Sequence, residues 1–390
     1  MLISLRARHA IRCAFGALLY CGIVVALTPA QAQEEVAVGQ QLAPYAAPVL
    51  PPPSTTVNGV STTLHLDAET LGVIGGDGQR GAVSLAAFQA NFGLDTAQAG
   101  WWRGGQFDLM LVGLRGSGNL QTRSGDLQLP SNLWAPNFLR VYQATYRQDF
   151  GPTFLQVGVQ DMNNTFDVTD VAGHLHNASF GISPTLTGNA NIATYPNPGL
   201  GAFGGVDLGG GASVQAGLWQ ADPPGMQGAL RRGALAIAEF DQTWGSDAQG
   251  PSTTLKFGAW HQHNSPDGSS ADGSGIYGIG QWTWTGSDQR QWGSFVQFGY
   301  SPAAPNVIRS YVGGGVRVEG LLPARPSDVL TVGVARAAPV GMLAETVVEA
   351  VYSLRLAHHL YLQPDLQHVR NPGGIPGRQW VAGLRLHLEQ

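Results

Sequence analysis

Residues 345–390 read ETVVEAVYSLRLAHHLYLQPDLQHVRNPGGIPGRQWVAGLRLHLEQ, and one pattern occurs three times in them with turns between. In the first repeat, apolar side chains at even positions from Val348 to Leu356 alternate with polar ones such as Glu349 and Arg355. A period of two indicates a β-strand with one apolar and one polar face. The three predicted strands are about 9–12 residues long, the length that a tilted strand needs to cross a bilayer. We therefore expect the apolar face to meet lipid and the polar face to line a wet barrel interior.

The composition differs from that of an ordinary soluble domain. Charged residues make up 12% of the chain, about half the usual share of roughly 25%. Hydrophobic residues, at 43%, are too ordinary in number for a helical membrane protein, whereas 54 glycines among 390 residues suit a closed sheet with tight turns. The only lysine is Lys256, which excludes a phosphate-binding loop and argues against nucleic-acid binding.

The N-terminal residues 1–32 have the features of a cleaved export signal. Arginines precede the apolar run 14–27, and residues 30–32 supply the small side chains that cleavage requires. Both cysteines, Cys13 and Cys21, lie inside this segment, so the mature chain would form no disulfide. A lipid anchor on Cys21 is a weaker alternative, because lipoprotein signals favour a small residue before the cysteine and the bulky Tyr20 stands there.

Two further regions follow the signal. Residues 33–57 are rich in proline and alanine, and we expect them to form an extended lead-in with little core of its own. Residues 58–390 are predicted to form one transmembrane antiparallel β-barrel, an all-β fold. Besides the three C-terminal strands, the expected strands are 59–66, 84–94, 106–116, 137–150, 153–161, 200–208, 212–220, 234–242, 253–262, 275–284, 292–300, 308–319 and 329–336. At about 17 residues per strand and turn, the barrel has about 16 strands, enough to hold an aqueous channel.

Two longer segments interrupt the strand pattern. Residues 117–136 are expected to form a polar loop. Residues 162–197 show no sustained alternation and carry several Asn, Asp and His residues beside Phe166, Phe180 and Tyr195. An insertion of this length in a regular barrel is either disordered or functional. We predict that it folds into the pore and constricts it, because loops on rigid scaffolds tend to carry function.

Four blocks carry a family resemblance. They include RVY at 140–142, NASFG at 177–181, GLLP at 320–323 and NPGG at 371–374. In these blocks, and over nearly all of the chain after about residue 58, the sequence resembles the carbohydrate-selective outer-membrane porins of the OprB family. The resemblance implies a 16-stranded porin of the bacterial outer membrane through which monosaccharides and similar small polar solutes diffuse, with no enzymatic step and no cofactor.

The chain departs from the family at three places. Gln143 stands where an acidic residue is common, and Thr145 stands where an aromatic residue is common. The chain ends in Leu388-Glu389-Gln390, whereas outer-membrane strands commonly end in an aromatic residue that is recognised during assembly.

Candidate pore-lining residues come from the predicted polar faces and from the matching blocks. Sugar hydroxyls both donate and accept hydrogen bonds, so a selective constriction needs charges and amides at close range. The alternative for each residue is a solvated wall position without selectivity. The candidates are Arg140, Asp161, Asn163, Asn177, Arg309, Arg317, Glu319, Glu345, Glu349, Arg355, Asp365, Gln367 and Arg385.

Three motifs could indicate a nucleotide, metal or catalytic site, but each is better interpreted as an ordinary structural feature. Residues 199–204 match GxGxxG, but prolines precede them and a predicted strand follows, which favours a turn into a glycine-rich strand. The pairs His174/His176 and His261/His263 have H-x-H spacing that could bind a metal on a strand, but no cysteine or fixed carboxylate accompanies them. No metal site is therefore predicted, and the acidic pair on residues 345 and 349 is interpreted as lumen-facing rather than as a glycosidase pair.

Two rival functions remain open. One is a secreted or periplasmic all-β protein that binds glycans or acts on them, which low charge and long strands disfavour. The other is a porin for other small solutes, and an anion channel is disfavoured by an acidic mature chain. The expected partners are carbohydrate solutes and outer-membrane lipid, without nucleic acid, and the protein is expected to be a homotrimer or a monomer.

Overall fold

The structure, a computed structural model, describes residues 58–221, 233–245, 251–264, 272–286, 290–302 and 304–389. These residues belong to one compact unit within residues 39–390. The predicted signal and lead-in, residues 1–57, lie outside the described residues. None of the helices in the described part of the chain is long and apolar enough to span a membrane.

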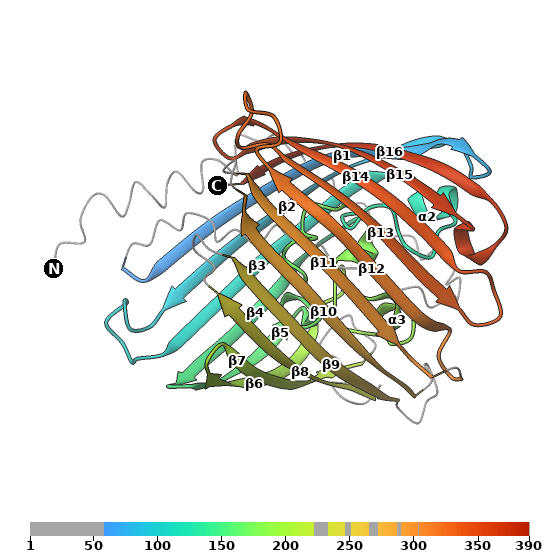
Figure 1. The fold of residues 1–390 in the computed structure, drawn as a ribbon. Coiled ribbons are helices and arrows are strands. Elements are labelled where there is room, and N and C mark those ends of the chain that lie inside the picture. Colours follow the sequence, from blue (N-terminus) through green and yellow to red (C-terminus); the bar gives the residue numbers. More distant parts are fainter. Residues whose placement is uncertain are drawn as a thin grey trace, which may run out of the picture. The chain divides into compact units, whose positions relative to one another are not determined.

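Sixteen strands form a closed barrel in which every strand is antiparallel to both of its neighbours, and β1 pairs with β16 to close the sheet (Figure 1). This confirms the predicted fold class. The strands are β1 (Val60–Gly76), β2 (Gly81–Asp95), β3 (Gly105–Ser117), β4 (Phe138–Phe150), β5 (Thr153–Gln160), β6 (Gly199–Gly209), β7 (Ala212–Gln220), β8 (Gly233–Gly245), β9 (Ser252–Asn264), β10 (Gly273–Thr285), β11 (Gln291–Tyr300), β12 (Ile308–Glu319), β13 (Val329–Pro339), β14 (Glu345–Ala357), β15 (Leu360–Arg370) and β16 (Arg378–Glu389).

Alternate positions of the strands differ in burial as the sequence pattern predicts. In β14 the odd positions from Glu345 to Ser353 are buried, and the even positions between them are exposed or half-buried. Large exposed apolar side chains occupy the outward positions, among them Val312, Val348 and Leu384. Since the outward side carries these apolar groups, it suits contact with lipid acyl chains.

The first hairpin is longer than predicted. β1 continues to Gly76 and β2 begins at Gly81, whereas the expected strands are 59–66 and 84–94. The alternation fails here because Leu71 and Val73, which point inward, are apolar and belong to a hydrophobic cluster inside the barrel. An apolar inner face therefore hides the period of two on which the prediction depends.

Two segments leave the same end of the barrel, opposite the end where β1 begins and β16 ends. The short inward segment, residues 118–137, joins β3 to β4 and contains the helix α2 (Leu120–Ser124). The long inward loop, residues 161–198, joins β5 to β6 and contains η1 (Met162–Asn164), η2 (Ala178–Phe180) and α3 (Pro184–Thr187). Both lie inside the barrel (Figure 1, around the labels α2 and α3). A further helical turn, η3 (Pro372–Gly374), lies between β15 and β16.

Candidate functional site

The short inward segment is attached to the barrel wall through Glu345 of β14. The backbone N–H groups of Leu127 and Gln128 donate hydrogen bonds of 2.8 and 2.7 Å to the two carboxylate oxygens of Glu345. Farther round the wall, Nε2 of Gln379 donates to the carbonyl oxygen of Ser124 at 2.8 Å. A carboxylate that accepts two backbone N–H bonds fixes the position of the segment, because such bonds are short and directional.

The short inward segment is less polar than expected for a polar loop. Leu120, Leu129, Leu133 and Trp134 are buried in a hydrophobic cluster that includes inward side chains of β1, β2 and β3. The segment thus fills part of the lumen and is not a loop at the rim of the barrel.

The long inward loop uses a second carboxylate of β14 in the same way. The N–H groups of His176 and Asn177 donate to Oε1 of Glu349 at 2.6 and 3.1 Å. Nδ2 of Asn177 donates to Oε1 of Gln367 on β15 at 3.1 Å. The two inward segments also bond to each other, since the N–H of Ala178 donates to the carbonyl oxygen of Leu129 at 2.9 Å.

A buried ion pair lies beside these contacts at the junction of β1 and β16. Nη2 of Arg385 lies 2.8 Å from Oε1 of Glu69, and the same nitrogen donates to Oδ1 of Asn132 in the short inward segment at 2.8 Å. The hydroxyl of Ser131 donates to the other oxygen of Glu69. The pair therefore holds the short inward segment to the wall as well as joining two strands.

Opposite β14, the long inward loop packs against aromatic side chains of the barrel wall. The Phe166 ring packs edge-on against Phe203 of β6 and Trp219 of β7, with centroid distances of 5.9 and 5.5 Å. The N–H of Asp167 donates to Oε2 of Glu239 on β8 at 3.0 Å, and the Tyr277 hydroxyl donates to the same oxygen at 2.7 Å. The loop thus crosses the lumen from the β6–β8 wall to the β14–β15 wall.

The two ends of the long inward loop are joined by Asp161. Its side chain accepts the N–H of Asn163 at 2.8 Å and the N–H of Tyr195 at 3.1 Å, and it also accepts the hydroxyl of Tyr142. Burial raises the pKa of Asp161 to about 6 and that of Asp167 to about 7, since the low-dielectric interior disfavours the charged carboxylate.

Burial disfavours the charged form of both loop histidines. Burial lowers the pKa of His174 to about 4, and burial also lowers the pKa of His176 well below its ordinary value. Neither lies on a strand, in contrast to the geometry that would make an H-x-H pair a metal site. In the other pair, His261 points outward from β9 and is exposed, and Nδ1 of His263 lies 3.4 Å from Oδ1 of Asp272. The predicted turn into a glycine-rich strand is confirmed, because β6 begins at Gly199.

The thirteen candidate residues differ in how accessible they are in the structure. Arg140 is half-buried and donates to the carbonyl oxygen of Pro196 at 2.8 Å, and Arg317, Glu319 and Arg355 also remain partly accessible. Arg309 is exposed at a register shift near the start of β12. The candidates that are buried beneath or within the inward segments are Asp161, Asn163, Asn177, Glu345, Glu349, Asp365, Gln367 and Arg385.

Partly accessible polar side chains also occur on inward positions of β2–β5 that the sequence analysis does not single out. Gln89 is paired with the buried, inward His65, so it points into the barrel. Two positions farther along β2, Nδ2 of Asn91 donates to the hydroxyl of Thr63 at 2.8 Å. Gln143 accepts from Nδ2 of Asn164 in the long inward loop at 3.0 Å. The same alternation that located β14–β16 could have found these residues.

A family model confirms the resemblance. The model described as carbohydrate-selective porin, OprB family, matches residues 79–283 and 205–389 in two overlapping stretches. No curated protein sequence matches the chain.

Solved porin structures share the fold. The chain superposes on the high-pH structure of Pseudomonas putida OprB with a TM-score of 0.77 at 18% identity, covering 85% of this chain and 94% of that one. For the low-pH structure of the same protein the TM-score is 0.60 at 17% identity, with 85% and 93% covered. For Salmonella typhi OmpF in complex with daunomycin it is 0.55 at 7% identity, with 86% and 100% covered. With the family match extending over most of the barrel, the chain belongs to the OprB family of carbohydrate-selective porins.

Proposed function

We propose that the protein is an outer-membrane porin through which small carbohydrates diffuse, and that its two inward segments set the size limit. The observation that carries the proposal is the long inward loop, which is hydrogen-bonded to β8 on one side of the lumen and to β14 on the other. A 16-stranded barrel without such a loop encloses a wide aqueous channel. A loop held across the channel narrows the passage. Solutes would then pass between the loop and the uncovered wall, the inward side of β2–β5 where polar side chains remain accessible.

The uncovered wall offers suitable chemistry for sugars. Amide side chains such as Gln89, Asn91 and Gln143 both donate and accept hydrogen bonds, as sugar hydroxyls do. This wall also carries an ion pair, in which a nitrogen of Arg147 lies 2.9 Å from an oxygen of Asp149. Such a surface supports weak, reversible contacts with neutral polar solutes, and diffusion requires no chemical step or cofactor.

Four of the pore-lining residues predicted from the sequence remain partly accessible, and we assign these to the solute pathway: Arg140, Arg317, Glu319 and Arg355. The buried candidates act on the pathway indirectly, by holding the inward segments in position. Export depends on the proposed signal of residues 1–32, and the N-terminus of the mature protein, identified by mass spectrometry, should begin at about Gln33.

Replacing residues 162–198 by a short Gly-Ser turn tests the size limit. The barrel should still fold, because Glu239 and Glu349 would then face channel water, where a carboxylate is well solvated. Single-channel conductance should rise, and liposomes should admit larger glucose oligomers than the wild type does. The outward substitution Val348→Ala serves as a control with unchanged conductance. An unchanged conductance and size cut-off in a folded deletion variant would place the constriction elsewhere on the wall.

A liposome-swelling panel of sugars, amino acids and anions of matched size tests the solute class. Faster entry of sugars than of equally large amino acids and anions is expected. Equal entry rates for all three classes would mean that the pore does not select for sugars. Faster entry of anions than of sugars would contradict the proposal.

A further inference from the structure

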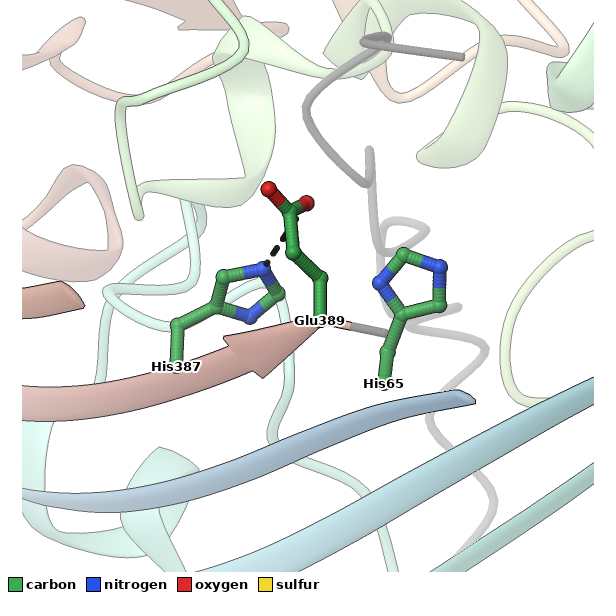
Figure 2. Close-up of side chains that lie close together, drawn as sticks. All are labelled: His65, His387 and Glu389. Carbon is green, nitrogen blue, oxygen red and sulfur yellow. Dashed lines mark ion pairs between the residues drawn. The ribbon is translucent and has the colours of Figure 1, made fainter. Parts of the chain in front are cut away.

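Two histidines and a glutamate converge on the inner side of the β1–β16 junction. Figure 2 shows His65 from β1 beside His387 and Glu389 from β16. The strand register places His65 opposite Glu389, so the cluster lies at the end of the barrel where β1 begins and β16 ends. One ligand-type atom of each of the three residues lies within 4.8 Å of the other two.

Two nitrogen atoms of the cluster lack a hydrogen-bond partner among the residues that the structure describes. They are Nδ1 of His65 and Nε2 of His387, and both are buried. The residues themselves are 5% and 3% exposed, and Glu389 is 7% exposed. Buried polar atoms without a partner cost free energy and occur seldom in native proteins, so each one calls for an explanation such as an ion.

Asp67 gives His387 the orientation of a metal ligand. Nδ1 of His387 lies 2.8 Å from Oδ1 of Asp67, so in the neutral ring this nitrogen donates its proton to the carboxylate. The lone pair is then on Nε2, which faces Glu389 (Figure 2). A carboxylate that bonds the distal nitrogen of a metal-binding histidine is the usual outer partner in such sites.

An ion pair alone accounts less well for the arrangement. Protonated His387 could interact with both Asp67 and Glu389, but Nε2 lies 3.8 Å from Oε2 of Glu389, too far for a hydrogen bond. This explanation also leaves Nδ1 of His65 unpartnered. An ion between the three residues would satisfy both nitrogens and the carboxylate.

We propose that His65, His387 and Glu389 bind a divalent transition-metal ion such as Zn²⁺, with Asp67 orienting His387. Two imidazoles and one carboxylate are ligands that Zn²⁺ readily accepts, with bonds of about 2.0–2.2 Å, and a water molecule would complete the coordination. Ligand atoms in a tetrahedral site lie roughly 3.4 Å apart by these bond lengths, so the side chains must close by about 1 Å. The ion would join the first and last strands of the barrel.

A second group of possible ligands is a poorer candidate. His176, Glu349 and Asp365 also lie close together. However, both oxygens of Glu349 already accept backbone N–H bonds of the long inward loop, and Oδ2 of Asp365 accepts from Gln367. Binding an ion there would break the contacts that hold the loop.

The experiment uses the full-length porin in detergent, treated with a chelator and then titrated with Zn²⁺ by calorimetry. We expect one high-affinity site per chain, and at a hundredfold excess over Kd a rise in unfolding temperature of about 5 °C. His65→Ala should weaken binding at least tenfold, and Asp67→Asn about 10–100-fold. Co²⁺ in place of Zn²⁺ should give a visible absorption band that His65→Ala removes.

His261→Ala is the matched control, because this histidine is exposed on the outer side of β9 and should leave the affinity unchanged. If His65→Ala does not fold, Glu389→Gln provides the same test with a side chain of equal size. The proposal is overturned if the wild-type porin does not bind Zn²⁺ below millimolar concentration. Wild-type affinity in a folded His65→Ala or Glu389→Gln variant would overturn it equally.

Discussion

Two parts of the barrel wall, β14–β15 and β6–β7, hold the long inward loop by different kinds of contact, and β8 adds a hydrogen bond through Glu239. On β14 and β15, Glu349 and Gln367 accept hydrogen bonds from loop groups at fixed positions. On β6 and β7, which lie about half a turn away around the barrel, Phe203 and Trp219 pack against the ring of Phe166. Hydrogen bonds to a buried carboxylate are directional, whereas ring packing stabilises mainly through the apolar area that it buries. The polar wall should therefore set where the loop lies, and the apolar wall should contribute more to its stability.

The largest expected effect is on the apolar wall. Phe166→Ala should lower the free energy of unfolding by about 3–5 kcal/mol, because it removes a fully buried ring and leaves a cavity. Urea unfolding in detergent measures this loss of free energy. Phe298→Ala is the control, because it makes the same substitution at an exposed outward position of β11. Single-channel conductance of the folded variant should change little. A large change in conductance would mean that the apolar wall also positions the loop.

Glu349→Ala should have the next largest effect and a different signature. It leaves the N–H groups of His176 and Asn177 without their acceptor, at a cost of about 2–4 kcal/mol in local opening of the loop. Hydrogen exchange at Asn177 should accelerate, and conductance should rise or fluctuate between levels. Val348→Ala, the neighbouring outward position, is the control. Wild-type exchange and steady wild-type conductance in Glu349→Ala would contradict the proposed role of the polar wall.

A smaller effect is expected from Asp167→Asn, and it should depend on pH. Since burial raises the pKa of Asp167 to about 7, the docked loop binds a proton that the exposed loop releases between about pH 4 and pH 7. Docking therefore weakens as pH rises through this window. The neutral variant should protect the loop better at pH 8, by about 1–2 kcal/mol, and equally at pH 4.

Hydrogen exchange at Ser183, whose N–H donates to Oδ2 of Asp167 at 2.7 Å, reports this difference directly. Asp161, with a pKa raised to about 6, changes stability in the same direction in both proteins and cancels in the comparison. A stabilisation at pH 8 that persists unchanged at pH 4 would show that the carboxylate of Asp167 is not responsible.

Alternation predicted the strands well because lipid on one side and the lumen on the other act on every second residue. It also assigned Glu349 and Arg385 correctly to the inward side. It could not show what covers these positions, since a period of two defines the side of a sheet and not the packing upon it. Arg385 was expected to line the pore, but it lies in a buried ion pair with Glu69.

The short inward segment could not be located for a related reason. Its buried apolar residues, Leu129, Leu133 and Trp134, are scattered among polar and proline residues without a period. Their partners are inward apolar residues of β1–β3, and that packing exists only once these strands have formed a sheet. In the same way, the cluster of His65, His387 and Glu389 unites residues from the two ends of the barrel domain, and only the pairing of β1 with β16 brings them together.

The contacts of the two inward segments also bear on the order of folding events. Leu127 and Glu345 are 218 positions apart in the chain, His176 and Glu349 are 173 apart, and Glu69 and Arg385 are 316 apart. Contacts between residues so distant in sequence form late, because each requires closure of a long loop of unfolded chain. Neither Glu345 nor Glu349 can receive its backbone partners until β14 has joined its neighbours. We infer that the strands associate around a water-filled lumen first, and that the inward segments dock onto a wall that is already assembled.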